Sequence, residues 1–193
     1  MSPLDPPPGD LSGFPSFPLV AAKRVYRIFH RDHLPWWFSS DGSGRFDLTV
    51  PSGTCYLAEE PLGAFVEVFR DTNVIDEADV TERLLATVVL PDVTQRLADC
   101  TLSAARGFGV TGAIHTTDDY DVTQTWARAF ARAGFSGIRY FGAHDPSQNV
   151  VSVAYFGRAG EQNYPVLIEP IDGTIVTAAY QRFGLLVLPA PRP

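Results

Sequence analysis

The residues best suited to chemistry fall between positions 24 and 67 of the chain. Two arginines, Arg27 and Arg45, a tyrosine, Tyr56, and a glutamate, Glu67, lie there among apolar runs. Between the two arginines is a loop of small polar and glycine residues: Ser39, Ser40, Gly42, Ser43 and Gly44. A charged side chain inside an apolar segment costs free energy unless it is paired or used. These residues are therefore the first candidates for a functional site.

The chemistry open to such a set is limited. Arginine binds phosphate through a fixed fork of donors, and Gly/Ser loops let backbone N–H groups approach an anion closely. A carboxylate can stabilise positive charge that develops on a sugar carbon, and an aromatic ring can stack on a base or a pyridinium. Together these groups suit a nucleotide diphosphate with a labile glycosidic bond, and NAD is the obvious candidate.

Three elements must position these side chains. The segments 25–29 and 54–58 are rich in β-branched and aromatic residues and are expected to be strands. Pro61 is expected to open a helix that carries Leu62, Phe65, Val66 and Phe69 at helical spacing, with Glu67 among them. Glu67 could alternatively pair with Arg27 or Arg45 as a buried structural salt bridge, and Tyr56 could serve only in packing.

The rest of the chain predicts one α+β domain. Residues 121–133 form the clearest amphipathic helix, with Gly134 as its C-terminal stop. Further strands are expected over 84–90, 137–141, 150–156, 166–168, 175–176 and 185–188, with a turn at 172–173. Many short strands and about three helices favour a curved, mostly antiparallel sheet over a βαβ repeat.

Composition agrees with a single soluble domain. The chain has 193 residues, of which 45% are hydrophobic, and a formal charge of −7. This balance does not favour a nucleic-acid surface, and no apolar run approaches the length of a membrane span. We see no signal peptide and expect buried free thiols at Cys55 and Cys100, and hence a cytoplasmic location. We expect a Pro-rich extended arm over 1–18, a catalytic domain over 19–188 and a tail over 189–193.

Other patterns in the chain do not indicate a site. His30 and His33 have no third ligand at usable spacing, so we expect no metal. The segment 107–112 matches G-x-G-x-x-G, but no strand-like run leads into it, so we expect a turn there. Glu59 and Glu60 are expected to form a solvated pair at a strand end. Trp36 and Trp37 flank the Ser/Gly loop. They could pack in the core or over the loop, or one of them could line the ligand pocket.

Four segments in order resemble the RES-domain family, which is named for Arg, Glu and Ser. The family has an arginine on its first strand, a G-G/S-x-R-[WF] segment, a Y-L-[AS] strand, an A-x-x-E helix and a later G-[IL]-x-Y segment. The matching residues are Arg27, then 42–46, 56–58, 64–67 and 137–146. The resemblance covers roughly 24 to 157. Where the family usually has its serine, this chain has Gly142.

The resemblance implies an ADP-ribosyltransferase-like fold and an enzyme that cleaves NAD or transfers ADP-ribose. Glu67, Arg27 and Tyr56 are then the expected catalytic set. The residues expected to bind NAD are Arg45, Ser39, Ser40, Gly44 and the backbone of Gly142, with Arg27 and Arg45 on the diphosphate. The acceptor stays open between water, phosphate and a protein, and a binding module without turnover is a third alternative. The family also implies an Xre-type antitoxin partner; a homo-oligomer is left open.

Overall fold

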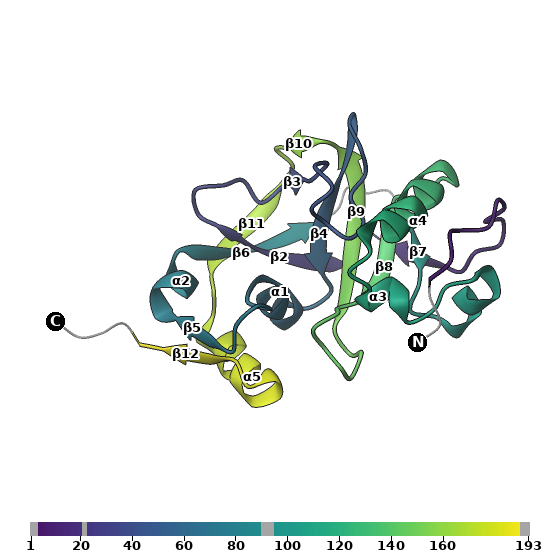
Figure 1. The fold of residues 1–193 in the computed structure, drawn as a ribbon. Helices are drawn as coiled ribbons and strands as arrows, with labels where there is room; N and C mark the ends of the chain where they lie inside the picture. The colour runs from purple at the N-terminus through teal and green to yellow at the C-terminus, as the bar shows by residue number, and fades with distance from the viewer. Residues whose placement is uncertain (1–3, 21–22, 90–94, 190–193) are drawn as a thin grey trace.

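The computed structural model describes residues 4–20, 23–89 and 95–189 (Figure 1). Its centre is one eight-stranded sheet. Across the sheet the strands lie in the order β1 (Ser16–Leu19), β7 (Gln95–Asp99), β8 (Gly137–Phe141), β9 (Val151–Arg158), β4 (Ser52–Ala58), β2 (Arg24–His30), β6 (Arg83–Val89) and β11 (Val166–Pro170). Only β7 and β8 run parallel in this sheet, so the predicted mostly antiparallel arrangement is confirmed.

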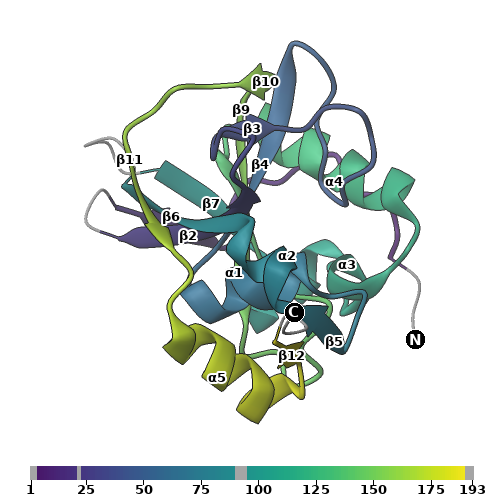
Figure 2. The same cartoon turned by 90° about the vertical axis from the view of Figure 1, so that its left-hand side faces the viewer.

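Three helices of eight or more residues pack around the sheet in the described part of the chain (Figures 1 and 2). They are α1 (Pro61–Val68), α4 (Tyr120–Arg132) and α5 (Gly173–Phe183), and α2 (Glu77–Thr81), α3 (Ala113–Thr116) and the 3-10 helix η1 (Ser103–Phe108) are shorter. Two small sheets complete the fold: β3 (Trp37–Phe38) with β10 (Gly160–Glu161), and β5 (Val74–Asp76) with β12 (Leu186–Leu188). None of the described helices is long and apolar enough to cross a membrane.

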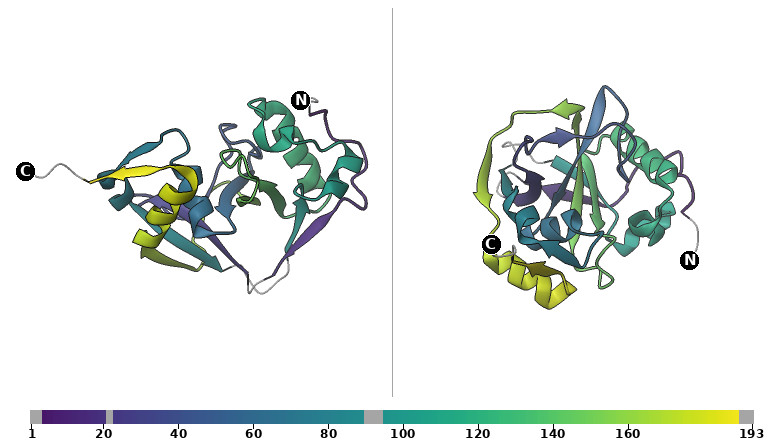
Figure 3. Two further views of the ribbon diagram at one scale, coloured as in Figure 1. Left: turned by 90° about the horizontal axis from the view of Figure 1, so that it is seen from below. Right: turned by 60° about the vertical axis from the view of Figure 1, so that its left-hand side comes forward.

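The sheet opens between β2 and β4. These two strands share a single paired position, Tyr26 with Ala58, whereas β4 pairs with β9 along all of Ser52–Ala58. Seen from below, β2, β6 and α5 lie on one side of the molecule and β7, β8 and α4 on the other (Figure 3). An interrupted ladder leaves room beside the strands that continuous pairing would fill, and the site described below lies there.

Two apolar cores flank this opening on the same face of the sheet. One packs α4 against β8, with Trp126, Phe130 and Ile138 fully buried, and the other packs α1 against α5, with Phe65 and Ala179 fully buried. A third core lies on the opposite face and contains Cys55 and Leu57, which alternate with Tyr56 and Ala58 along β4. The expected buried free thiols at Cys55 and Cys100 are confirmed.

The N-terminal segment joins the domain. Residues Ser16–Leu19 form the edge strand β1, so the boundary expected at 18/19 falls inside a strand. Phe14 is 5% exposed and packs edge-on against Phe130 with ring centroids 4.7 Å apart. The segment 4–14 is thus fastened by apolar contacts to α4. Of the expected C-terminal tail, residues 190–193 lie outside the described residues.

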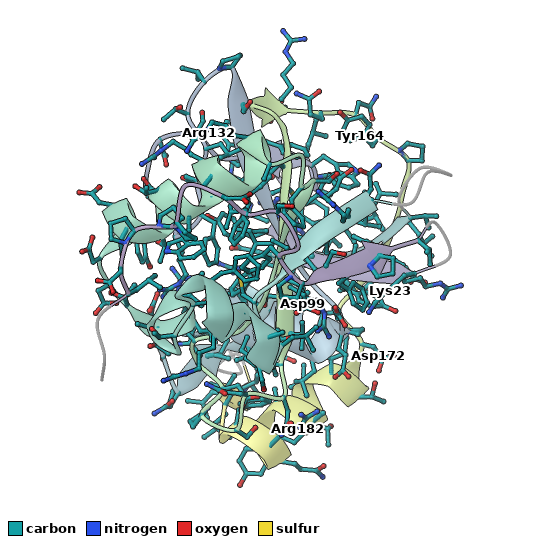
Figure 4. All side chains as sticks on the ribbon, turned by 90° about the vertical axis from the view of Figure 1, so that its right-hand side faces the viewer. Lys23, Asp99, Arg132, Tyr164, Asp172 and Arg182 are labelled. Atoms are coloured by element: carbon teal, nitrogen blue, oxygen red, sulfur yellow. The ribbon has the colours of Figure 1, made fainter. Side chains whose placement is uncertain are left out.

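The structure has a helix where a strand was predicted at 175–176. Ile175 and Val176 were expected in a strand but lie in α5, whose ends are marked by Asp172 and Arg182 in Figure 4. The Asp172 carboxylate accepts from Thr174 N at 2.7 Å and caps the helix instead of forming a turn. Ile175 and Ala179 are buried in the core with α1, so tertiary burial outweighs the β-branched preference of this stretch.

A second correction concerns Glu59, which is not solvated. Its carboxylate lies 2.7 Å from Lys23 Nζ and 2.6 Å from Arg139 Nε, and Arg139 Nη1 lies 3.3 Å from Asp99 Oδ2. Figure 4 labels Lys23 and Asp99, the two ends of this network. Arg139 lies on β8 next to Tyr140, so its side chain leaves the sheet on the other face from the opening. Glu60, in contrast, is exposed as expected.

Candidate active site

A cavity of about 610 Å3 lies beside the opening of the sheet. Its walls come from the Ser/Gly loop, the end of α1, the α3–α4 connection and the turn after β8. The residues that line it are Trp37, Ser39, Asp41, Ser43, Gly44, Arg45, Tyr56, Glu67, Arg70, Asp71, Thr116, Asp118, Tyr120, Tyr140, Ala143 and His144. Five of the eight predicted site residues, namely Arg45, Glu67, Tyr56, Ser39 and Gly44, therefore share one cavity.

The Ser/Gly loop is organised around Asp47, whose side chain is buried. The Asp47 carboxylate accepts from Ser39 Oγ at 2.7 Å, from Gly44 N at 3.0 Å and from the Tyr56 hydroxyl at 2.8 Å. The Tyr56 hydroxyl in turn accepts from Phe46 N at 2.9 Å. A buried carboxylate needs such partners to be stable, so Asp47 sets the shape of the loop that walls the cavity.

Helix α4 clamps the same loop from outside. Gln124 Nε2 donates to the carbonyl oxygens of Gly42 and Gly44, both at 2.9 Å, and Thr123 Oγ1 donates to Arg45 O at 2.5 Å. A side chain at Gly44 would force its neighbours to move, because a Cβ atom would overlap the Asp47 carboxylate and the Tyr56 hydroxyl. The loop is therefore fixed by its neighbours before any ligand binds.

Arg45 lines the cavity and is held in place by two contacts. Its Nη1 donates to Thr117 O, and its guanidinium carbon lies 5.1 Å from the centroid of the Tyr120 ring. The nearby buried His115 accepts from Phe141 N through Nδ1 at 3.3 Å. Burial and the positive charge of Arg45 lower the pKa of His115 to about 4. His115 is thus uncharged at neutral pH.

Glu67 has a partner that the sequence analysis did not anticipate. Arg70 Nη1 lies 2.8 Å from Glu67 Oε1, three positions along from it at the end of α1. The Glu67 side chain is 31% exposed and the Arg70 side chain 42%. The structure therefore places Glu67 in the cavity, paired with Arg70 and not with Arg27 or Arg45.

Tyr56 and Tyr140 form the floor between the two apolar cores. Tyr140 is buried and packs edge-on against Phe46, with ring centroids 4.8 Å apart. Burial raises the pKa of Tyr140, and Glu67 raises it further, while Arg45 and Arg70 act in the opposite direction. Burial and Asp47 likewise raise the pKa of Tyr56. Both phenols stay neutral at physiological pH, and Tyr140 lines the cavity together with Glu67, Arg45 and Arg70.

Arg27 lies in a second, smaller pocket of about 130 Å3 between β2 and β4. This pocket shares Tyr56, Glu67 and Tyr140 with the larger cavity, so the two adjoin. Arg27 Nη1 donates to Trp37 O and to Cys55 Sγ, both at 2.9 Å. Its guanidinium is thus engaged by the protein on the side of β3 and β4, and Arg27 is not among the residues that line the larger cavity.

Two further predicted residues lie outside the lining of either pocket. Ser40, in the Ser/Gly loop, is half-buried. The Gly142 N–H, expected to reach a phosphate, donates to Val150 O at 2.9 Å and is used within the protein. The next residues, Ala143 and His144, do line the cavity. Of the two tryptophans that flank the loop, Trp36 is buried and Trp37 lines the cavity at 48% exposure.

The fold and the cavity define a single α+β domain with a site of arginine, glutamate and tyrosine side chains at the opening of its sheet. The chain belongs to the RES domain family, whose model matches residues 24–169. A similar solved structure is that of the M. tuberculosis MbcT–MbcA toxin–antitoxin complex, with a TM-score of 0.54 and 20% identity over 83% of this chain and 88% of that chain. At this identity the likeness shows the fold. No curated protein matches the chain.

Proposed function

We propose that this protein cleaves the bond between nicotinamide and ribose in NAD, and that it is the toxin of a toxin–antitoxin pair. The observation that carries the proposal is the convergence of Glu67, Arg45 and Tyr56 on one cavity of about 610 Å3. Such a cavity has the size of a ligand site. Membership of the RES domain family and the likeness to a toxin–antitoxin complex support the same function.

The proposed reaction needs positioning more than acid catalysis. The C1′–N bond breaks and its electron pair leaves with the nicotinamide, which becomes neutral, so no proton has to be supplied. Positive charge develops on C1′ and the ring oxygen of the ribose, and the Glu67 carboxylate stabilises it. Arg45 and the Ser39–Gly44 loop hold the diphosphate, and the Tyr56 ring borders the nicotinamide. Arg27 shapes the adjoining pocket behind Glu67.

A nucleophile then bonds to C1′. With water, the products are ADP-ribose and a proton, and with phosphate, the phosphorylated ADP-ribose. With a protein side chain the enzyme would be a mono-ADP-ribosyltransferase that uses the same pocket, and a chain that binds NAD without turnover is the remaining alternative. These outcomes leave different products, so one incubation separates them.

The test is nicotinamide release from NAD by the purified protein, followed by chromatography. We expect release by the wild type and a loss of at least about 100-fold in Glu67→Gln, the scale typical for one electrostatic group in an active site. Glu161→Gln is the matched control, because Glu161 lies on β10 outside the cavity. NAD bound without nicotinamide release would refute the proposal, and label transferred to protein would favour the transferase.

The toxin part of the proposal has its own test. Expression of the chain in a bacterium is expected to lower cellular NAD in the cytoplasm and arrest growth, and Glu67→Gln to relieve the arrest. Co-expression of the protein encoded by the neighbouring gene, expected to be an Xre-type antitoxin, should also relieve it. Arrest that persists in Glu67→Gln would refute a toxic activity based on this site.

A further inference from the structure

The cations of the larger cavity are not the two arginines expected from the sequence. Among the described residues that line it, the guanidinium groups are those of Arg45 and Arg70. Arg27 lines only the smaller pocket, and its Nη1 is taken by Trp37 O and Cys55 Sγ. A diphosphate placed in the larger cavity therefore meets Arg45 and Arg70.

Arg45 and Arg70 line the same cavity from different elements. Arg45 follows the Ser/Gly loop and lies over the Tyr120 ring at 5.1 Å, and Arg70 follows α1. Both side chains line this cavity together with Glu67 and Tyr140. The lining also holds four carboxyl side chains: Asp41, Glu67, Asp71 and Asp118. Among these carboxyl groups, two cations stabilise a doubly charged diphosphate better than one.

The contact between Arg70 and Glu67 bears on the reaction. At 2.8 Å the guanidinium neutralises much of the negative charge that Glu67 would present to a ribose. Both side chains are partly exposed, and ion pairs of this kind contribute little in water. A phosphate group, which accepts bidentate hydrogen bonds from arginine, can therefore compete with Glu67 for Arg70.

We infer that Arg70 is the second guanidinium of the diphosphate site, and that the bound diphosphate draws it away from Glu67. The carboxylate then faces the ribose with its full charge only when substrate is present. This inference rests on the proposed function and names the residue that links diphosphate binding to the reacting bond. Arg70 acts on the reaction through Glu67 and is a positioning residue as well as a ligand of the phosphates.

Calorimetric binding of ADP-ribose, with adenosine as the phosphate-free comparison, tests the diphosphate contact. In Arg70→Gln we expect the Kd for ADP-ribose to rise about tenfold, the scale of a charge-assisted hydrogen bond, with adenosine binding unchanged. The Kd of Arg70→Lys for ADP-ribose should lie between those of the wild type and Arg70→Gln. Arg83→Gln is the control, because the Arg83 guanidinium lies 5.1 Å from the Phe69 ring centroid and outside the cavity. Arg70 is partly exposed, so its variants should fold, and Arg70→Lys carries the test if the glutamine variant does not.

The release of Arg70 from Glu67 has a separate signature. Glu67→Gln should bind ADP-ribose more tightly than the wild type, because Arg70 no longer has a competing carboxylate. That gain should be absent when Arg70→Gln is the background. The inference would be overturned if Arg70→Gln bound ADP-ribose with the Kd of the wild type, or if Arg83→Gln lost as much affinity as Arg70→Gln. It would also be overturned if Glu67→Gln still gained affinity in the Arg70→Gln background, or if the wild type did not bind ADP-ribose. A wild type that binds ADP-ribose but releases no nicotinamide from NAD would refute only the proposed reaction.

Discussion

The Tyr56 hydroxyl donates to Asp47 Oδ1 at 2.8 Å, which ties the floor of the cavity to the loop that forms its wall. Tyr56 comes from the central strand β4 and Asp47 from the loop before it, and both are enclosed by the apolar core around Phe46. Because the same carboxylate also holds Ser39 and Gly44, the wall keeps its shape through one buried group. The preorganisation of the site therefore depends on Asp47.

Asp47→Asn should weaken this arrangement without changing the size of the side chain. An amide NH2 in place of Oδ2 cannot accept from Gly44 N or Ser39 Oγ, and a buried donor without a partner costs about 1–3 kcal/mol. We expect the free energy of unfolding to fall by roughly 2 kcal/mol in urea titrations. Asp10→Asn, which alters an exposed turn with one contact to Ser12 N, is the control. Equal stability of Asp47→Asn and the wild type would contradict this account of the loop.

Gly44→Ala tests the close packing of the loop against the floor. The added methyl group would overlap Asp47 Oδ1 and the Tyr56 hydroxyl and would lie 2.9 Å from Tyr56 Cε2. Overpacking of this kind costs about 1–3 kcal/mol, and we expect a fall in Tm together with weaker NAD binding. Gly107→Ala is matched to it, because nothing lies within 4 Å of a Cβ atom there. If both variants melt at the wild-type temperature, the loop moves more freely than these contacts imply.

Much of the fold follows from local patterns, and the exception is instructive. The strand 25–29 and the helix from Pro61 were predicted within a residue or two of β2 and α1. The strand was indicated by its β-branched and aromatic residues and the helix by its helical spacing, and both signals are local. Residues 175–176 were predicted as a strand because Ile and Val are β-branched. Their burial against α1 in the helix α5 depends on tertiary contacts that no local pattern records.

The site was predicted less completely than the fold. The rule that singled out Glu67, a charge among apolar residues, applies equally to Asp47 between Phe46 and Leu48, so Asp47 could have been found. Arg70 was not singled out, although its spacing of three from Glu67 allows a pair on one face of a helix. The turning of Arg27 toward Trp37 and Cys55 could not be foreseen, because it depends on the opening between β2 and β4.

His115 predicts a specific pH dependence of stability. Its pKa is about 4 in the folded protein, lowered by burial and by Arg45, against an ordinary value of 6.5. Between these two values the unfolded chain binds the proton and the folded one does not, so stability falls as the pH drops from 6.5 toward 4. The full loss of stability is about 3 kcal/mol, because a shift of one pKa unit corresponds to about 1.4 kcal/mol. Above pH 6.5 His115 makes no pH-dependent contribution.

The measurement is urea denaturation of the wild type and of His115→Gln between pH 4 and pH 7. Glutamine keeps an acceptor for Phe141 N but does not titrate, so the difference in stability between the two proteins should shrink as the pH falls through this window. His33→Gln, at an exposed position, should parallel the wild type. A constant difference between His115→Gln and the wild type would show that His115 keeps its ordinary titration in the fold.

Gly142→Ser should be accepted by the fold. A Cβ atom at position 142 would lie 3.5 Å from Val150 Cγ1 and 3.9 Å from Ser152 Oγ, which are ordinary contacts. We expect the free energy of unfolding to stay within about 1 kcal/mol of the wild type, and nicotinamide release to be no slower. Gly137→Ser, five positions earlier on β8, is the matched contrast, because its Cβ atom would lie 2.5 Å from Ala154 O. Thermal melts and NAD turnover of both variants check this; a Gly142→Ser protein as unstable as Gly137→Ser would mean that glycine is required at 142 by the backbone itself.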